Sequence, residues 1–196
     1  MSKLFSPLQL RSLTLRNRIM VAPMCQYSCC DGLPNTWHQV HLGSRAVGGA
    51  AVVVVEATAV CPEGRISPSD CGLWNDVQAE VFTPIAKFIN EQGAIPAIQI
   101  GHAGRKASTT APWLGGGSLD PANGGWPPVA PSPIPFNDTS PVPLELDEEG
   151  LEQIARQFES AAQRALAAGF KIVQVHMAHG YLLHQFLSPL SNQRTD

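Results

Sequence analysis

The sequence has little that would suit a disulfide-rich, membrane-spanning or nucleic-acid-binding protein. Its five cysteines are few and odd in number, and no pair has the Cys-x-x-Cys spacing of a structural zinc site. The most apolar run, residues 50–55, is far shorter than the ~20 residues that span a bilayer. Charged residues make up 15% of the chain and the formal net charge is -3, so neither nucleic acid nor an anionic membrane is an expected partner.

The amino terminus also lacks the long apolar segment of a signal peptide, and a cytoplasmic location is the default expectation. Most of the cysteines are therefore expected to be free thiols in a reducing compartment. With 196 residues the chain is long enough to bury a substantial core, and a single domain over residues 1–196 is expected.

Hydrophobic periodicity predicts alternating strands and helices after a small hairpin at residues 8–15. Strands are expected at residues 19–22, 51–55, 95–100 and 170–175. Helices are expected at residues 37–47, 77–91 and 148–168, capped by Asn35 or Thr36 in the first and by Asp147 in the third. Pro84 should mark a kink or a later start of the second helix. This order predicts an α/β fold with a parallel sheet and right-handed crossovers.

A long irregular segment, residues 101–146, interrupts this alternation after the third strand. Nine of the seventeen prolines lie between Pro112 and Pro143, together with two clusters of glycine. Such a segment is typical of a functional cap or lid over one end of a sheet, and a disordered linker is the alternative.

Polar side chains follow the predicted strands where each strand ends, most densely at His176, His179 and Tyr181. Because parallel strands present their carboxyl ends at one edge, these side chains should face a common mouth. Imidazole N–H groups can polarise a carbonyl oxygen and a phenol can deliver a proton, which suits addition to an activated double bond. The alternative is that one histidine caps a helix and the other is solvated.

Five segments resemble, in order, motifs of the Old Yellow Enzyme ene-reductases, and more closely those of the thermophilic-like subclass. They are residues 22–27 (APMCQY), 54–60 (VVEATAV), 64–66 (GRI), 99–107 (QIGHAGRKA) and 179–196. The resemblance covers essentially the whole chain, and the joint presence of these motifs is highly specific. It implies a TIM (β/α)8 barrel that binds FMN and passes a hydride from NADPH or NADH to an electron-poor alkene, such as an enone or nitroalkene.

The resemblance also implies which residues contact the flavin: Pro23, Met24, Cys25, Ala57 and Gln99. Gln99 would hydrogen-bond the polar pyrimidine edge, and the Cys25 thiol would tune the reduction potential of the flavin. Without the resemblance, Cys25 would be interpreted as a small buried hydrophobic residue.

Catalytic roles follow from the same resemblance. His176 and His179 would bind the substrate carbonyl oxygen as an oxyanion hole, Tyr181 would donate a proton to the α-carbon, and Tyr27 would help to orient the substrate. Arg105 has no assigned catalytic role, and holding the long segment by pairing with a carboxylate is an equally good interpretation of it.

About four of the eight strands of a barrel are predicted, so the chain matches the first four βα units, an amino-terminal half-barrel. Open edges at the first and last strands imply a complementary carboxyl-terminal half-barrel or a homo-oligomer partner, with weak FMN binding and little activity alone. One alternative is a non-catalytic folding or assembly module. Another is a zinc hydrolase using His176, His179 and either His102 or His184, but it lacks a nearby carboxylate, and no metal is expected.

Overall fold

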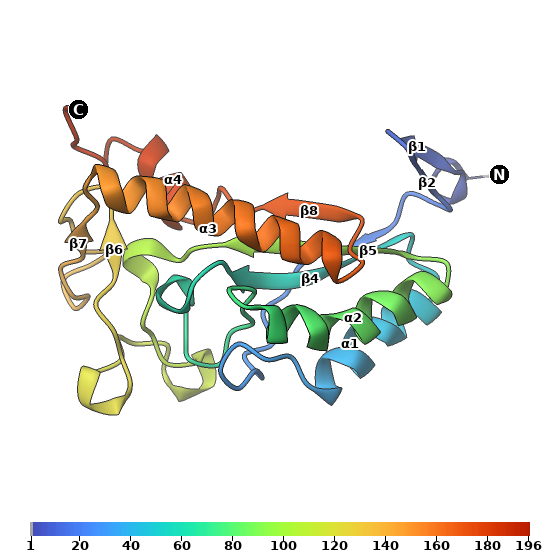
Figure 1. The fold of residues 1–196 in the computed structure, drawn as a ribbon, viewed down its shortest axis with the longest axis horizontal. Coiled ribbons are helices and arrows are strands. Elements are labelled where there is room, and N and C mark those ends of the chain that lie inside the picture. Colours follow the sequence, from blue (N-terminus) through green and yellow to red (C-terminus); the bar gives the residue numbers. More distant parts are fainter. Residues whose placement is uncertain (1) are drawn as a thin grey trace.

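The structure is a computed structural model that describes residues 2–196. Its centre is a four-stranded parallel sheet in the order β3-β4-β5-β8. The strands are β3 (Met20–Val21), β4 (Val52–Ala59), β5 (Ile95–Gly101) and β8 (Ile172–Val175). Three helices connect them and cover one face of the sheet: α1 (Thr36–Val47), α2 (Asp76–Glu91) and α3 (Glu148–Ala167) (Figure 1). The predicted alternation and parallel sheet are confirmed.

Side-chain caps set where the helices begin. The side chain of Asn35 accepts the backbone N–H of Trp37, and Asp147 accepts that of Gly150. At α2, Asn75 and Gln78 form a capping box that supplies hydrogen-bond partners to backbone N–H groups at the start of the helix. The helix continues through Pro84. A later start at Pro84 was therefore a wrong expectation, because the capped first turns already form ahead of the proline. None of the helices in residues 2–196 is both long and apolar enough to cross a membrane.

The main core lies between the sheet and the three helices. Val53 and Val55 of β4 point into it, where Phe82 of α2 meets Phe170 with ring centroids 5.7 Å apart in an edge-to-face contact. Val52 and Val54 point to the opposite face and form a second, smaller cluster. Burial on both faces explains why this strand is continuously apolar rather than alternating.

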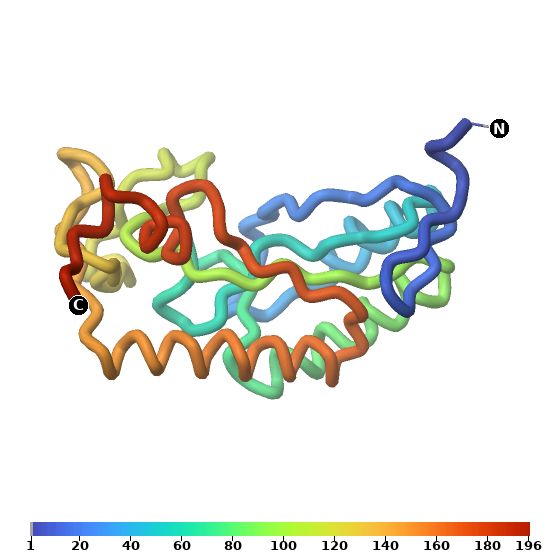
Figure 2. The backbone as a smooth tube through the Cα atoms, turned by 90° about the horizontal axis from the view of Figure 1, so that it is seen from above, coloured from blue at the N-terminus to red at the C-terminus, as the bar shows by residue number. Residues whose placement is uncertain are grey.

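The amino-terminal hairpin consists of β1 (Leu8–Leu10) and β2 (Leu13–Leu15), paired antiparallel. Leu15 is 6% exposed and packs in the smaller cluster. The hairpin lies at the end of the sheet where the strands start, and the long segment lies at the opposite end (Figure 2). The hairpin therefore does not cover the carboxyl ends of the strands, and the segments that carry the candidate site lie there.

Residues 101–146 contain short 3-10 helices and two short parallel strands, β6 (Val129–Ala130) and β7 (Leu144–Glu145). The segment is held against the body of the protein by Arg65, whose guanidinium carbon lies 5.3 Å from the centre of the Trp74 ring and 4.9 Å from that of Trp126. The Trp126 indole N–H donates to the carbonyl of Glu63 at 2.9 Å. These contacts order the segment beside α4 (Leu182–Leu187), a short helix that the periodicity did not predict.

Candidate active site

The loop between β8 and α4 brings three aromatic side chains together. Ring centroids lie 5.0 Å apart for His176 and His179, 4.9 Å for His176 and Tyr181, and 6.3 Å for His179 and Tyr181, all edge to face. The backbone N–H of His176 donates to the carbonyl of Ile100 at 2.9 Å, which fixes the start of the loop on β5. The structure thus places the two imidazoles and the phenol in one group at the carboxyl end of the sheet.

The turn that carries His179 has an unusual backbone that two side chains from outside the turn hold in place. His179 and Gly180 have φ angles of 59° and 73°, in the left-handed region. Lys106 Nζ donates to the carbonyl of His179 at 2.9 Å, and Gln185 Nε2 donates to that of Gly180 at 2.7 Å. These bonds compensate for the unfavourable backbone angle of His179 and direct its ring toward His176.

Hydrogen bonding determines which nitrogen of His176 can serve as a donor. The backbone N–H of Ala178 donates to Nδ1 of His176 at 3.3 Å, so the neutral ring carries its proton on Nε2. The side chain is 7% exposed, and this burial, followed by the charge of His179, lowers its pKa. His176 is therefore neutral at pH 7 and presents an N–H group rather than a positive charge.

Tyr181 is a protonated phenol at neutral pH. Burial raises its pKa to about 12, with smaller electrostatic contributions from Cys25 and Asp70. Asp70 is 2% exposed and accepts the Ile66 N–H and the Ser67 hydroxyl, both at 2.7 Å, while burial raises its pKa to about 6. The sequence did not single out Asp70, because a Ser-x-x-Asp pattern occurs in many ordinary turns.

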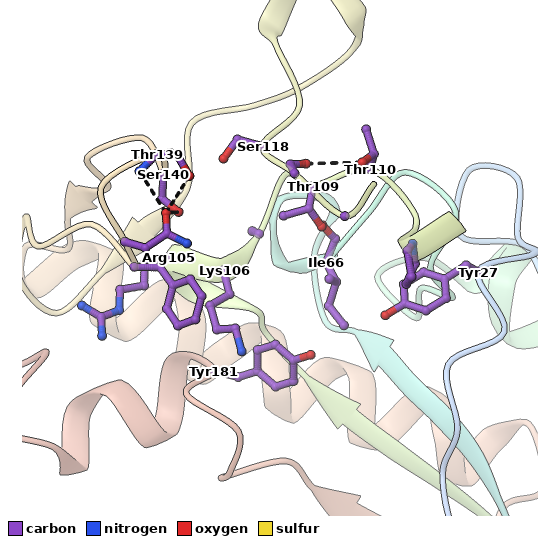
Figure 3. A pocket seen from close by; sticks show the side chains of 16 residues that line it. Tyr27, Ile66, Arg105, Lys106, Thr109, Thr110, Ser118, Thr139, Ser140 and Tyr181 are labelled. Atoms are coloured by element: carbon purple, nitrogen blue, oxygen red, sulfur yellow. Dashed lines mark hydrogen bonds between the residues drawn. The ribbon is translucent and has the colours of Figure 1, made fainter. Parts of the chain in front are cut away.

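A cavity of about 220 Å³ opens beside this group, with Tyr27 and Tyr181 on its walls. Figure 3 shows the two phenol hydroxyls directed toward the space between the rings. Tyr27 has a φ of 48° and packs edge to face on Trp113, with centroids 5.7 Å apart. Burial raises the pKa of Tyr27, so both phenols keep their protons. Most of the remaining wall comes from residues 101–146, including Lys106, which the sequence placed in a motif without a role.

The neighbouring strand ends present a thiol, a methyl group and an amide in a row. Ala57 pairs in register with Gln99, and Gln99 pairs with Gln174 of β8 and donates to its side-chain oxygen at 3.1 Å. On the other side β3 leads into Pro23, which is half-buried, and into Met24, which is 45% exposed.

The thiol in this row belongs to Cys25. Burial, followed by the charges of Asp70 and Glu56, raises its pKa to about 12. Cys25 is therefore a neutral thiol and not a nucleophilic thiolate. The Cys25 thiol and the Gln99 amide are both hydrogen-bond donors, and the small Ala57 lies between them. This arrangement suits a planar heterocycle with polar edges that lies across the ends of the strands.

Two other predicted residues take structural positions. His102 is 3% exposed, and its Nδ1 accepts the backbone N–H of Gly104 at 3.0 Å. Arg105 donates to the carbonyls of Ile134 and Pro135, both at 3.2 Å. Arg105 does hold the long segment, but the expected carboxylate partner was wrong, because free backbone carbonyls of the proline-rich segment reach it instead.

His176 and His179 lie close together, but neither His102 nor His184 joins them in a group of three potential metal ligands within residues 2–196. Within residues 2–196 the group of three potential metal ligands consists of Cys29, His38 and Cys71, all of them buried. Nδ1 of His176 and Nδ1 of His184 accept backbone N–H groups instead.

Comparisons with known proteins agree with this geometry. The chain is 47% identical over 100% of its length to NADH:flavin oxidoreductase FG08077 of Gibberella zeae, and 44% identical over 98% to an NADPH dehydrogenase of Geobacillus thermodenitrificans. It spans about half of these relatives, 48% and 53% of their lengths. The crystal structure of Old Yellow Enzyme from Pichia sp. AKU4542 superposes with a TM-score of 0.86 at 27% identity, covering 99% of this chain and 50% of that one.

The four βα units are thus part of a TIM (β/α)8 barrel of the Old Yellow Enzyme type, as the motifs predicted. A family model matches residues 3–196, nearly the whole chain. This chain belongs to the NADH:flavin oxidoreductase / NADH oxidase family.

Proposed function

We propose that this chain supplies the catalytic half of an FMN-dependent reductase that uses NADPH or NADH to reduce electron-poor C=C bonds, as in enones and nitroalkenes. The observation that carries the proposal is the group of His176, His179 and Tyr181 beside a cavity at the carboxyl ends of the strands. Family membership supports the flavin, and a relative named NADPH dehydrogenase supports the nicotinamide.

The residues that would hold FMN are Pro23, Met24, Cys25, Ala57 and Gln99. They fit it because they lie near or just beyond the carboxyl ends of adjacent strands, and the neutral Cys25 thiol and the Gln99 amide are polar groups separated by the small Ala57. When bound, FMN supplies the hydride that it has accepted from the nicotinamide. The thiol is a weak hydrogen-bond donor, which suits a role in tuning the flavin rather than in covalent chemistry.

His176 and His179 would bind the substrate carbonyl oxygen. The Nε2–H of the neutral His176 is a free donor, because Nδ1 already accepts a backbone N–H. A donor directed at the oxygen stabilises the negative charge that builds up there as the alkene is reduced, and one such donor is typically worth about 3 kcal/mol of the barrier. Lys106 contributes indirectly by holding the carbonyl of His179.

Tyr181 would donate the proton that completes the reduction at the α-carbon. Its pKa of about 12 keeps the phenol protonated at neutral pH, and its ring lies 4.9 Å from that of His176. Tyr27, on the opposite wall, would orient the substrate between the two phenols. We propose that residues 101–146 cap the site and limit the access of water to it, because they form most of the cavity wall.

We also propose that a complementary half-barrel completes the protein. An almost wholly apolar groove of about 530 Å³ lies between α3, β8 and α4, lined by Leu151, Ile154, Ala155, Phe158, Val175, Leu183 and Phe186. Both edge strands, β3 and β8, lack a neighbour on their outer side within the described sheet. These open surfaces favour one alternative function, a non-catalytic assembly module, which the following experiment separates from the reductase.

FMN binding and alkene reduction together test the proposal. The chain would be titrated with FMN, with and without a carboxyl-terminal half-barrel from the Geobacillus relative, and then supplied with NADPH and 2-cyclohexenone. We expect tight binding and turnover only with both halves, and weaker FMN binding for Gln99→Leu but not for the exposed control Gln163→Leu. Binding without turnover would contradict the reductase, and no binding with both halves would favour the assembly module.

A further inference from the structure

A second cluster of reactive side chains lies outside the proposed catalytic group. The sulfur atoms of Cys29 and Cys71 are 2.9 Å apart, and each lies 3.5 Å from Nε2 of His38. Their exposed fractions are 8% for Cys29, 0% for Cys71 and 1% for His38. No function assigned above uses any of these three side chains.

Backbone hydrogen bonds hold the two cysteines opposite each other. The N–H of Cys29 donates to the carbonyl of Ser69 at 2.9 Å, and the N–H of Gly72 donates to that of Gly32 at the same distance. The carbonyl of Cys71 accepts the N–H of Ala59 in β4 at 2.8 Å. The facing sulfurs are therefore a consequence of two paired segments anchored to the sheet.

The protonation of His38 argues against a metal at this place. Burial lowers the pKa of His38, but the hydrogen bonds to Cys29 and Glu56 outweigh it and raise this pKa to about 9, so Nε2 carries a proton at neutral pH. That N–H faces the carboxylate of Glu56, 3.1 Å away, as well as the two sulfurs. A metal would need the lone pair of Nε2, whereas here this atom is a donor.

The surroundings instead activate one of the two thiols. The hydrogen bond from Cys71 and, more weakly, that from His38 lower the pKa of Cys29 to about 7 against the opposing effect of burial. Burial and the neighbouring Cys29 raise the pKa of Cys71 well above its usual value. At neutral pH a substantial fraction of Cys29 is thus a thiolate that accepts a hydrogen bond from a protonated Cys71.

We propose that Cys29 and Cys71 form a redox-active dithiol, which a small peroxide converts into an intrachain disulfide. This inference does not depend on the proposed reductase function. Forming the bond requires the sulfurs to approach from 2.9 Å to about 2.05 Å, a movement that small side-chain rotations can supply. All five cysteines are unpaired in the structure, so the pair is in its reduced form.

The reaction with hydrogen peroxide balances in two steps. The Cys29 thiolate attacks one peroxide oxygen and breaks the O–O bond, giving a sulfenic acid at Cys29 and hydroxide, which takes up a proton to become water. The Cys71 sulfur then attacks the sulfenic sulfur, and the hydroxyl group leaves with the Cys71 proton as a second water. Two thiols are oxidised to one disulfide and one peroxide is reduced by two electrons. A dithiol reductant reverses the change by exchange.

The disulfide would join two segments that border the candidate site. Cys29 lies in the loop that carries Cys25 and Tyr27, and Cys71 follows the buried Asp70. The two cysteines are 42 positions apart in sequence, so the bond would restrict a long stretch of the unfolded chain. The oxidised protein should therefore have a higher Tm than the reduced one.

Peptide mapping after mild peroxide treatment tests the proposal. The purified chain would be oxidised with hydrogen peroxide, alkylated with iodoacetamide and digested with trypsin without reduction. A disulfide from Cys71 should link the peptide of residues 66–87 to that of residues 19–45, with fragmentation assigning the partner to Cys29. Cys30→Ser is the matched control, because Cys30 is adjacent in sequence but exposed.

We expect the linked peptides in the wild-type chain and in Cys30→Ser, and their loss in Cys29→Ser. Cys71→Ser should stop at a sulfenic acid that dimedone traps on Cys29. Oxidation confined to Cys30, a sulfinic acid at Cys29 without the link, or stoichiometric zinc in the untreated chain would each overturn the proposal. Mapping of the wild-type chain and Cys30→Ser is decisive by itself if a buried variant fails to fold.

Discussion

Acidification should reveal how much the buried, neutral His102 contributes to the free energy of unfolding. Burial lowers the pKa of His102 from 6.5 to about 4, because a charged imidazole loses its hydration inside the protein. The carbonyl of His102 accepts the N–H of Leu182 at 2.9 Å, so the residue also supports the start of α4 next to Tyr181. A charge at this position would disturb both the buried pocket and that helix.

The sign and size of the effect follow from the two pKa values. The folded protein binds this proton more weakly than the unfolded chain, so the contribution of His102 is complete above pH 6.5 and is lost as the pH falls toward 4. Each tenfold difference in proton affinity corresponds to about 1.4 kcal/mol, so the loss reaches about 3 kcal/mol near pH 4.

Asp70 acts in the opposite direction over nearly the same range. Its pKa rises from 3.8 to about 6 on folding, so the folded protein binds this proton more tightly and gains stability as the pH falls through 6. The two effects partly cancel in the wild-type chain, and its pH profile alone would conceal them. Comparison with His102→Gln removes the histidine contribution and leaves that of Asp70 in both proteins.

The assay is urea unfolding of the wild-type chain and of His102→Gln, followed by tryptophan fluorescence at pH 7 and near pH 4. Whatever the cost of the substitution at pH 7, the free energy of unfolding of the variant should rise relative to the wild type by about 3 kcal/mol on acidification. A difference between the two proteins that stays constant within about 0.5 kcal/mol would refute the reasoning.

Three further substitutions test the packing of the core and the cap of α2. Phe82→Ala removes a ring that is 0% exposed and should lower the free energy of unfolding by about 3–5 kcal/mol, whereas Val77→Ala, 58% exposed on the same helix, should change it by less than about 0.5 kcal/mol. Asn75→Ala removes the N-cap of α2 and should cost about 1 kcal/mol by the same urea assay. Equal effects of Phe82→Ala and Val77→Ala would contradict the position of the core, and an unchanged Asn75→Ala would contradict the cap.

The regular elements could be predicted because their signals are local. The run at residues 51–55 is apolar on both faces, and Asn35 and Asp147 cap helices with clear stripes. The strand predicted at residues 51–55 was too short. In the structure β4 continues to Ala59, across an irregularity in the register between Val55 and Ala57. The helix α4 has six residues and no capping side chain, so neither periodicity nor a start signal marked it.

The positions of the candidate site residues could be predicted only where the parallel sheet determines them. His176 and Tyr27 could be expected near one another because both follow strands of one parallel sheet. The contact of Lys106 with His179 spans 73 positions and depends on the path of the long segment. The same holds for Cys29 and Cys71, whose meeting is decided by how two irregular segments pair.

Tyr181→Phe in the complete, FMN-loaded protein tests the central claim most directly. The substitution removes the phenol hydroxyl and keeps the ring beside His176. Stopped-flow measurements would follow separately the reduction of the flavin by NADPH and its reoxidation by 2-cyclohexenone. We predict an unchanged first step and a second step slower by about 10²–10⁴-fold, since the proton donor is lost. Reoxidation at the wild-type rate would contradict the role of Tyr181 and, with it, the proposed catalytic group.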